Sequence, residues 1–162
     1  MQAFERELLT LLPRLRRFAR ALTHDPADAD DLLQVALERA LRAQGQWTRG
    51  TRLDAWMMRI VRNCWIDEMR SRARRARTFA PEEDGDMVGV DMQNEIEARA
   101  EMHAVDRAMA SLSPEQREVI ALVLVEGLAY REAAELLDIP MGTLTSRLTR
   151  GRQALVQLLD AA

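Results

Sequence analysis

The stretch between residues 127 and 155, GLAYREAAELLDIPMGTLTSRLTRGRQAL, constrains this chain most, because it predicts two helices joined by a tight turn. Residues 131–137 contain no helix breaker and carry an apolar stripe. The first helix must end before Pro140, since the residue preceding a proline is excluded from the α conformation. Pro140 also suits the start of the second helix, because its φ is fixed near the helical value. The stretch therefore predicts a helix-turn-helix.

The second helix of this pair has two different faces. Small and apolar residues recur at intervals of four, three and four, which predicts a buried stripe of Leu144, Leu148, Gly151 and Leu155. The opposite face carries hydroxyls and arginines, with three arginines and no acid between residues 142 and 153. Such a face suits the DNA major groove, where these groups contact phosphates and base edges. A solvated basic face is the alternative for an isolated helix, but the short helix and turn before it favour DNA binding.

Charge is segregated along the chain. The formal net charge of −3 argues by itself against a nucleic-acid-binding protein, and all 23 basic residues are arginine. Residues 59–77, however, hold seven arginines against two acids, whereas residues 78–101 hold eight acids against one arginine. This segregation indicates separate working surfaces.

Composition indicates an all-α protein. The 162 residues include only 7 Gly and 5 Pro, and the hydrophobic fraction of 48% permits a core built from Leu, Ala, Val and Met. No apolar run approaches 18 residues and no signal peptide is visible, so we expect a soluble, cytoplasmic protein without membrane insertion. Cys64 is expected to be buried and inert. One Cys and two His without metal-ligand spacing predict neither a metal site nor a cofactor.

The first half of the chain predicts three helices, over residues 2–22, 27–43 and about 54–77. Pro13 is expected to kink or divide the first. The acids at the start of the second helix are sufficiently explained by the favourable interaction of negative charge with the helix dipole. A metal site formed by these carboxylates is the alternative. Residues 44–54 read as a loop that presents Trp47.

The third helix combines a buried stripe with a cationic end. Trp65 lies off the stripe, so it either packs on a second face or meets a ligand. There are more arginines between residues 70 and 77 than stabilisation by the helix dipole explains. They predict that this end of the helix binds a polyanion.

The second half begins after residues 78–93, which are acidic, contain Pro and Gly, show no period and read as a flexible linker. A helix over residues 94–112 follows, and Ser113 with Gln116 forms a capping box that starts another helix ending at Gly127. The predicted fold is therefore all-α, with two small helical domains, 1–77 and 94–162, joined by the acidic linker 78–93.

Four motifs in sequence order resemble the bacterial extracytoplasmic-function (ECF, group IV) sigma factors of the sigma-70 family. They are DADDLLQ at 28–34, WMMRIVRN at 56–63, LSPEQREV at 112–119 and the helix-turn-helix itself. The resemblance covers nearly the whole chain, and residues 12–20 are similar to the general-stress subgroup. It implies a sigma region 2 domain, a sigma region 4 domain and no active site, which agrees with the absence of any nucleophile–base pair.

The resemblance also implies partners and site residues. The helix at 27–43 would dock on the β′ clamp helices of core RNA polymerase with Asp31, Leu32, Gln34, Leu37 and Glu38. The loop after it would take a flipped base of the minus-ten element, and the third helix would hold the melted strand. The residues implied for the minus-ten element are Trp47, Arg49, Arg52, Arg59, Arg62, Asn63, Arg70, Arg72, Arg74 and Arg75. Aromatic and arginine side chains suit this task, since they stack on and neutralise single-stranded DNA.

The helix-turn-helix would read the minus-thirty-five element with Thr143, Thr145, Ser146, Arg147, Thr149, Arg150 and Arg152, and its domain would contact the β flap. Two positions depart from the family pattern: Val35 stands where an acid is usual, and Thr145 where a basic residue is common. The implied function is an alternative sigma factor that melts promoter DNA and initiates transcription of a stress regulon, controlled by an anti-sigma factor. The alternatives are a sigma-like decoy that sequesters an anti-sigma factor and a helix-turn-helix repressor unrelated to polymerase.

Overall fold

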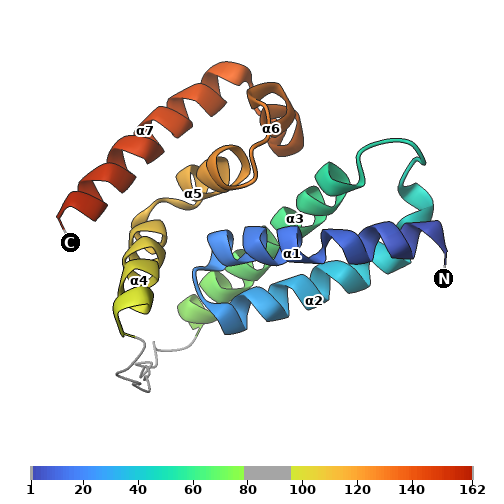
Figure 1. The fold of residues 1–162 in the computed structure, drawn as a ribbon, viewed down its shortest axis with the longest axis horizontal. Coiled ribbons are helices and arrows are strands. Elements are labelled where there is room, and N and C mark those ends of the chain that lie inside the picture. The colour runs from blue at the N-terminus through green and yellow to red at the C-terminus, as the bar shows by residue number, and fades with distance from the viewer. Residues whose placement is uncertain (1, 79–95, 162) are drawn as a thin grey trace.

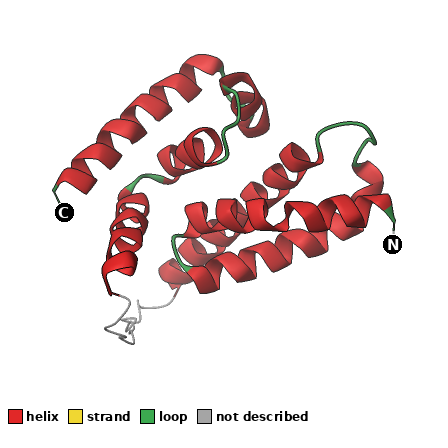
Figure 2. Cartoon of the chain, viewed as in Figure 1, coloured by secondary structure: helices red, strands yellow, loops and turns green. Residues whose placement is uncertain are grey.

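The computed structural model describes residues 2–78 and 96–161, and every regular element among them is helical (Figures 1 and 2). The predicted linker lies almost entirely outside the described residues. Three helices form the first bundle: α1 (Ala3–Thr23), α2 (Pro26–Arg42) and α3 (Leu53–Thr78), with a short 3-10 turn, η1 (Gln44–Gln46), between the last two. The predicted all-α fold class is confirmed.

Short-range backbone and capping hydrogen bonds form the turn between α1 and α2. His24 ends α1 in the left-handed conformation, with φ of 53°, and its N–H donates to the carbonyl of Arg20. The Asp25 carboxylate then accepts a hydrogen bond from the N–H of Asp28, the N-cap geometry expected of this residue. α1 continues as one helix through Pro13, which lies on its exposed side, so of the two predicted effects the division of the helix is excluded.

The second half contains α4 (Ile96–Ser111), α5 (Pro114–Ile120), α6 (Tyr130–Leu137) and α7 (Met141–Asp160). The capping box at the start of α5 is present, with Gln116 N–H donating to Ser113 Oγ and Ser113 N–H to the Gln116 side chain. A π-helical segment, η3 (Ala121–Val125), follows α5 and was not predicted. In this wider turn the N–H of Glu126 donates to the carbonyl of Ala121, which turns Glu126 inward and buries it.

The helix-turn-helix is formed by α6 and α7. Asp138 ends α6 in the left-handed conformation, with φ of 56°, and Pro140 precedes the first residue of α7. Leu144, Leu148 and Gly151 are buried as predicted, whereas Leu155 is only partly covered because it lies near the end of the helix.

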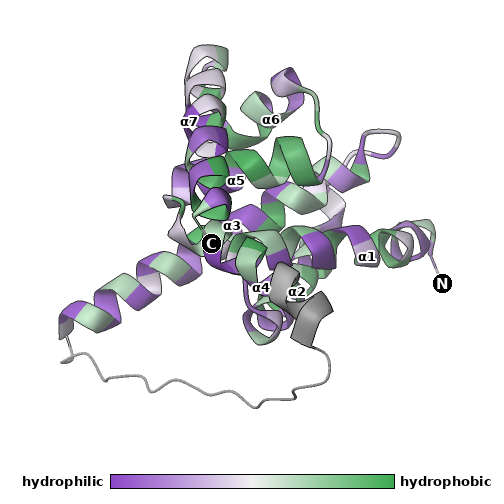
Figure 3. Ribbon diagram, turned by 60° about the vertical axis from the view of Figure 1, so that its left-hand side comes forward, coloured by the Kyte–Doolittle hydropathy of each residue, from purple (hydrophilic) through white to green (hydrophobic). Residues whose placement is uncertain are grey.

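The two halves pack on each other and share one hydrophobic core (Figure 1). η3 and α5 lie against α1, α6 touches α3, and α7 forms the outer edge of the molecule, away from the first bundle. Figure 3 shows strong apolar colour in the middle of the molecule, where α5 ends and η3 follows. Within the described ranges, no helix is both long and apolar enough to cross a membrane, and no cluster of His, Cys, Asp or Glu could hold a metal ion.

Gly151 is the close-approach point between α7 and α5. A Cβ built there would lie 3.1 Å from Cγ1 of Ile120. We therefore expect Gly151→Leu to overpack this contact and lower the free energy of unfolding by about 1–3 kcal/mol in denaturant titration. Gly142→Leu is the matched control, since a Cβ at Gly142 meets nothing within 4 Å. Equal stability of the two variants would contradict this packing.

Candidate nucleic-acid interface

The outer face of α7 is polar, basic and accessible. Thr145, Ser146, Thr149, Arg150 and Arg152 are exposed, while Thr143 and Arg147 are half-buried at its flanks. The hydroxyl of Thr145 donates to the carbonyl of Met141 at 2.9 Å, which leaves its oxygen free to accept. These residues occupy one helical surface opposite the buried leucines, so they can meet one groove of a duplex together.

A second cationic surface follows the C-terminal half of α3. Asn63, Arg70, Arg74 and Arg77 are exposed, and together with the arginines nearby they extend over about four turns. Arg72 and Arg75 both donate to Glu68, at 3.1 and 3.3 Å. Such exposed ion pairs are weak and screened, so a phosphate can replace the glutamate at little cost.

The loop before α3 differs from the prediction in one respect. Trp47 is half-buried and not fully presented to solvent: its ring lies 5.6 Å from that of Phe4 and packs against the core, so it anchors the loop. Its indole Nε1 is buried without a hydrogen-bond partner among the described residues. Arg49 stays exposed in the same loop, beyond the packed ring.

Trp65 packs inside the protein, which decides between the two interpretations left open by the sequence. Only 4% of the residue is exposed, and the guanidinium carbon of Arg117 lies 5.7 Å from its ring centroid. Cys64 beside it is buried as predicted, and burial raises the pKa of its thiol, which keeps it protonated.

Arg117 joins the two halves from a buried position. Its guanidinium donates to four carbonyl oxygens: those of Met109, Ala110 and Leu112 at the end of α4, and that of Leu22 in α1. Burial lowers the pKa of Arg117 below its ordinary value, yet an arginine remains charged. The cation therefore satisfies the negative C-terminal ends of two helices at once.

Ion pairs cross between the halves at several further points. Arg62 in α3 binds the carboxylate of Glu118 in α5 with both Nε and Nη2, at 2.8 and 3.2 Å. Arg17 in α1 grips Glu126 in the same bidentate way, at 2.9 and 3.0 Å, and Arg14 adds a third contact at 3.3 Å. The side chains of Glu118 and Glu126 are 3% and 0% exposed, so each carboxylate depends on its arginines for charge compensation.

Asp54 binds two arginines, Arg14 and Arg52. It accepts from Arg14 at 2.9 Å and from Arg52 at 2.9 and 3.1 Å, and Arg52 also pairs with Glu132 of α6. The hydrogen bond from Arg52, with help from Arg14, lowers the pKa of Asp54 to about 2. From the sequence, Arg14 and Arg17 had the appearance of an ordinary solvated face and Asp54 that of a helix start, and nothing there paired them with these acids, although Glu118 and Glu126 flank an apolar run.

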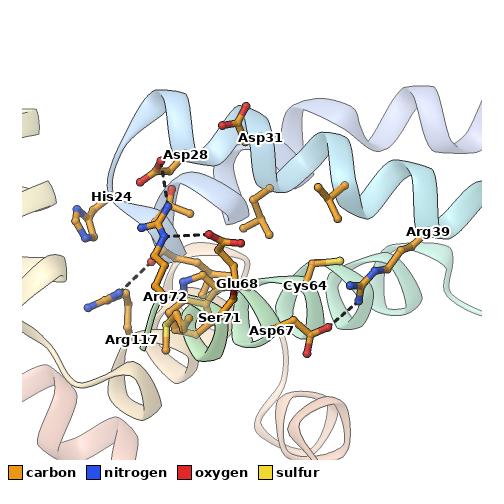
Figure 4. Close-up of a pocket in the computed structure, with 16 residues that line it drawn as sticks. His24, Asp28, Asp31, Arg39, Cys64, Asp67, Glu68, Ser71, Arg72 and Arg117 are labelled. Atoms are coloured by element: carbon orange, nitrogen blue, oxygen red, sulfur yellow. Dashed lines mark hydrogen bonds and ion pairs between the residues drawn. The ribbon is translucent and has the colours of Figure 1, made fainter. Parts of the chain in front are cut away.

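The helix predicted to dock on polymerase presents most of the expected residues. Asp31, Gln34 and Glu38 are exposed and Leu37 is half-buried, but Leu32 is 7% exposed and packs inside the bundle. A cavity of about 490 Å³ opens beside them, between α2 and α3. Figure 4 shows Arg72 at its rim between Asp28 and Glu68, with Arg39 bound to Asp67 farther along. Val35, the exposed residue that departs from the family pattern, also lines this cavity. The cavity therefore combines an apolar side chain with a rim of charged residues.

Comparison with known proteins defines the class of both halves. Residues 8–75 match the family description "Sigma-70 region 2" and residues 102–155 match "Sigma-70, region 4". The chain thus pairs the two conserved modules of a sigma-70-type factor.

Individual proteins similar to this chain identify the group of sigma factors to which it is related. The chain is 33% identical over 154 residues to the ECF RNA polymerase sigma factor EcfG of Rhodopseudomonas palustris (strain TIE-1), covering 94% of this chain and 83% of EcfG. It resembles the sigma factor RpoE solved with the anti-sigma factor NepR from Bartonella quintana, with a TM-score of 0.83, 31% identity, and 99% and 98% of the two chains covered. CnrH, solved with the cytosolic domain of CnrY, gives a TM-score of 0.72 at 26% identity, with 98% and 88% covered.

The chain belongs to the ECF RNA polymerase sigma factors. Members of this family are promoter-specificity subunits that bind core RNA polymerase and promoter DNA, and they are not enzymes themselves.

The lowered pKa of Asp54 predicts how the stability of the folded protein depends on pH. Because its pKa in the folded protein lies below the value of about 3.9 for a free aspartate, its stabilisation is present above pH about 4. It is lost as the pH falls towards about 2, and solvent screening holds the effect to about 1 kcal/mol. The free energy of unfolding, measured by denaturant titration, should fall as the pH is lowered from about 4 to about 2. We expect Asp54→Asn to remove the contribution of this carboxylate to that fall. Identical pH profiles for the variant and the parent chain would contradict the assignment.

Proposed function

We propose that this chain directs core RNA polymerase to stress promoters, reads the minus-thirty-five element with α7 and holds the melted minus-ten strand with α3. The observation that carries the proposal is the face of α7, where exposed hydroxyls and arginines line one side of a helix packed by leucines on the other. This arrangement supports base contacts from Thr145, Ser146, Thr149 and Arg150, and phosphate contacts from Arg147 and Arg152, with Thr143 at the helix start.

The minus-ten role rests on α3 and the loop before it. The surface Arg49, Arg59, Asn63, Arg70, Arg74 and Arg75 is exposed, and Arg52, Arg62 and Arg72 lie beside it in ion pairs. Single-stranded DNA binds such a cationic surface with little sequence requirement. The flipped base would be taken by the exposed part of the loop, between residues 48 and 52, because the Trp47 ring is packed.

Core polymerase would dock on α2 through Asp31, Gln34, Leu37 and Glu38, with Leu32 holding the helix in place from the core. The domain bounds we propose are 1–77 for region 2, 78–93 for the acidic linker and 94–162 for region 4. Since two similar sigma factors are solved with the anti-sigma proteins NepR and CnrY, we propose an anti-sigma partner for this chain as well. The site of action is the cytoplasm, where the family works with RNA polymerase.

The decisive experiment is run-off transcription from fragmented genomic DNA with purified core polymerase, with and without this protein. We expect new start sites that share paired upstream motifs. No new start site with core binding intact would indicate a missing promoter or activator, and loss of core binding as well would favour the sigma-like decoy. Duplex binding that needs no polymerase would favour a simple repressor.

Arg150→Ala tests the reading of the minus-thirty-five element. We expect a loss of about 1–3 kcal/mol in promoter binding by the holoenzyme, confined to one base position, since an arginine that reads a base edge contributes this much. Gln157→Ala, on the exposed end of the same helix, is the control. A uniform loss across all promoter sequences would show that Arg150 holds a phosphate instead.

Asp31→Ala tests polymerase docking. We expect weaker binding to core polymerase, by about 1–2 kcal/mol in a competition assay, because an interfacial charge that pairs with the partner is lost. Glu7→Ala, an exposed acid on α1, is expected to bind core like the parent chain. Unchanged core affinity in Asp31→Ala would exclude this surface.

A further inference from the structure

Met141 is an exposed apolar side chain at the start of the helix proposed to read the promoter. It is the first residue of α7, and 46% of it is exposed to solvent. The structure describes all of α7, and over its first three turns no other large apolar side chain is exposed, because Leu144 and Leu148 are buried. A lone exposed methionine is ordinary on most surfaces, so its position determines what it can do.

Met141 lies on the same face of α7 as the proposed minus-thirty-five residues. Residues four positions apart lie on one side of a helix, so Met141, Thr145 and Thr149 form one row. All three are exposed, and none carries a charge. The row runs beside Ser146 and Arg150, which are also exposed. The methionine therefore forms one end of the surface that is proposed to meet the DNA.

The turn before α7 fixes the backbone of Met141 without using its side chain. The N–H of Ile139 donates to the carbonyl of Ala134 at 3.0 Å, and the Ile139 side chain packs against the core. The hydroxyl of Thr145 donates to the carbonyl of Met141 at 2.9 Å, within the first turn of the helix. The side chain of Met141 is thus held at a defined place and remains available for a partner.

The chemistry of the major groove limits what that partner can be. Every base pair presents hydrogen-bond donors and acceptors there, whereas thymine is the one base that adds a methyl group. A thioether is a poor hydrogen-bonding group, so a methionine gains most by covering an apolar group. The N-terminal residues of a recognition helix are the ones that contact base edges. An exposed methionine at this end of α7 therefore matches thymine.

We infer that Met141 contacts the C5 methyl group of a thymine in the minus-thirty-five element, and that this contact selects an A·T pair at one position. The inference deepens the proposed function and rests on it, because it requires α7 to lie in the major groove. The hydroxyls and guanidinium groups of the same face recognise donors and acceptors, whereas Met141 recognises a methyl group.

The other end of α7 supplies a control. Val156 is also an exposed apolar residue, at 56%, but it lies 15 positions beyond Met141, or about 22 Å along the helix axis. A side chain at that distance cannot contact the base pair that Met141 meets. Val156→Ala should therefore leave the recognition of thymine unchanged.

The test removes the methyl group from the DNA. The probes are fluorescent duplexes of a promoter mapped by run-off transcription, in which deoxyuridine replaces one thymidine at a time in either strand of the minus-thirty-five element. Deoxyuridine keeps the base pair and its hydrogen-bonding groups and lacks only the C5 methyl. For the holoenzyme with the parent chain, we expect one replacement to weaken binding about fourfold in fluorescence anisotropy, the loss expected for one buried methyl group.

The variants assign that loss to one side chain. Met141→Ala should bind the thymidine duplex about fourfold more weakly than the parent chain, and it should not distinguish thymidine from deoxyuridine at that position. Met141→Leu keeps an apolar side chain and should retain the distinction, whereas Met141→Gln, with a polar end, should lose it. Since Met141 lies outside the core, all three variants should unfold at the denaturant midpoint of the parent chain.

An equal effect of deoxyuridine on Met141→Ala and on the parent chain would overturn the inference, because another side chain, such as Thr145, would then contact the methyl group. So would a parent chain that binds every deoxyuridine duplex as tightly as the thymidine duplex, or an element without any A·T pair.

Run-off transcription with the same holoenzyme separates this failure from failure of the proposed function. If the parent chain initiates transcription but does not distinguish thymidine from deoxyuridine, the Met141 contact alone is refuted. If it initiates at no promoter, the proposed function fails, and the inference that rests on it fails as well.

Discussion

The buried guanidinium of Arg117 is the interaction on which the arrangement of the two halves depends. It collects carbonyl oxygens from the end of α4 and from Leu22 near the end of α1, and it lies over the ring of Trp65. A cation with this burial is tolerated because its planar fork donates to four carbonyl oxygens and its face lies over an aromatic ring. The region 2 bundle and the start of region 4 are thereby joined at one charged but satisfied point.

Around that point, ion pairs between the halves accompany the apolar contacts of the shared core. Arginines of region 2 face acids of region 4, and the two most buried acids each receive a bidentate guanidinium. An interface built this way is specific in its closed form, yet each arginine can exchange its carboxylate for a phosphate. The net charge of −3 does not conflict with DNA binding, because the charges are segregated and residues 59–77 hold seven arginines against two acids.

Most of the local structure could be predicted because its causes lie within a few residues. The Ser113 capping box and the turn before Pro140 are short-range effects, and both are present. The predictions that were wrong depended on distant packing. The loop was predicted to present Trp47, whereas its ring is half-buried because Phe4, far away in the sequence, packs against it. The π-helical segment after α5 was missed because an apolar run has the same appearance in either kind of helix.

The sequence by itself determined the helices, the two charged surfaces and the face of α7, since hydrophobic period, caps and charge runs are properties of neighbouring residues. Only the tertiary structure decided which arginines meet which acids. Arg17 and Glu126 are separated by 109 positions, and nothing in the pattern around either residue selects the other. Their pairing follows from how η3 turns Glu126 inward and how α1 is placed against it, and the sequence pattern predicts neither the turn nor the placement.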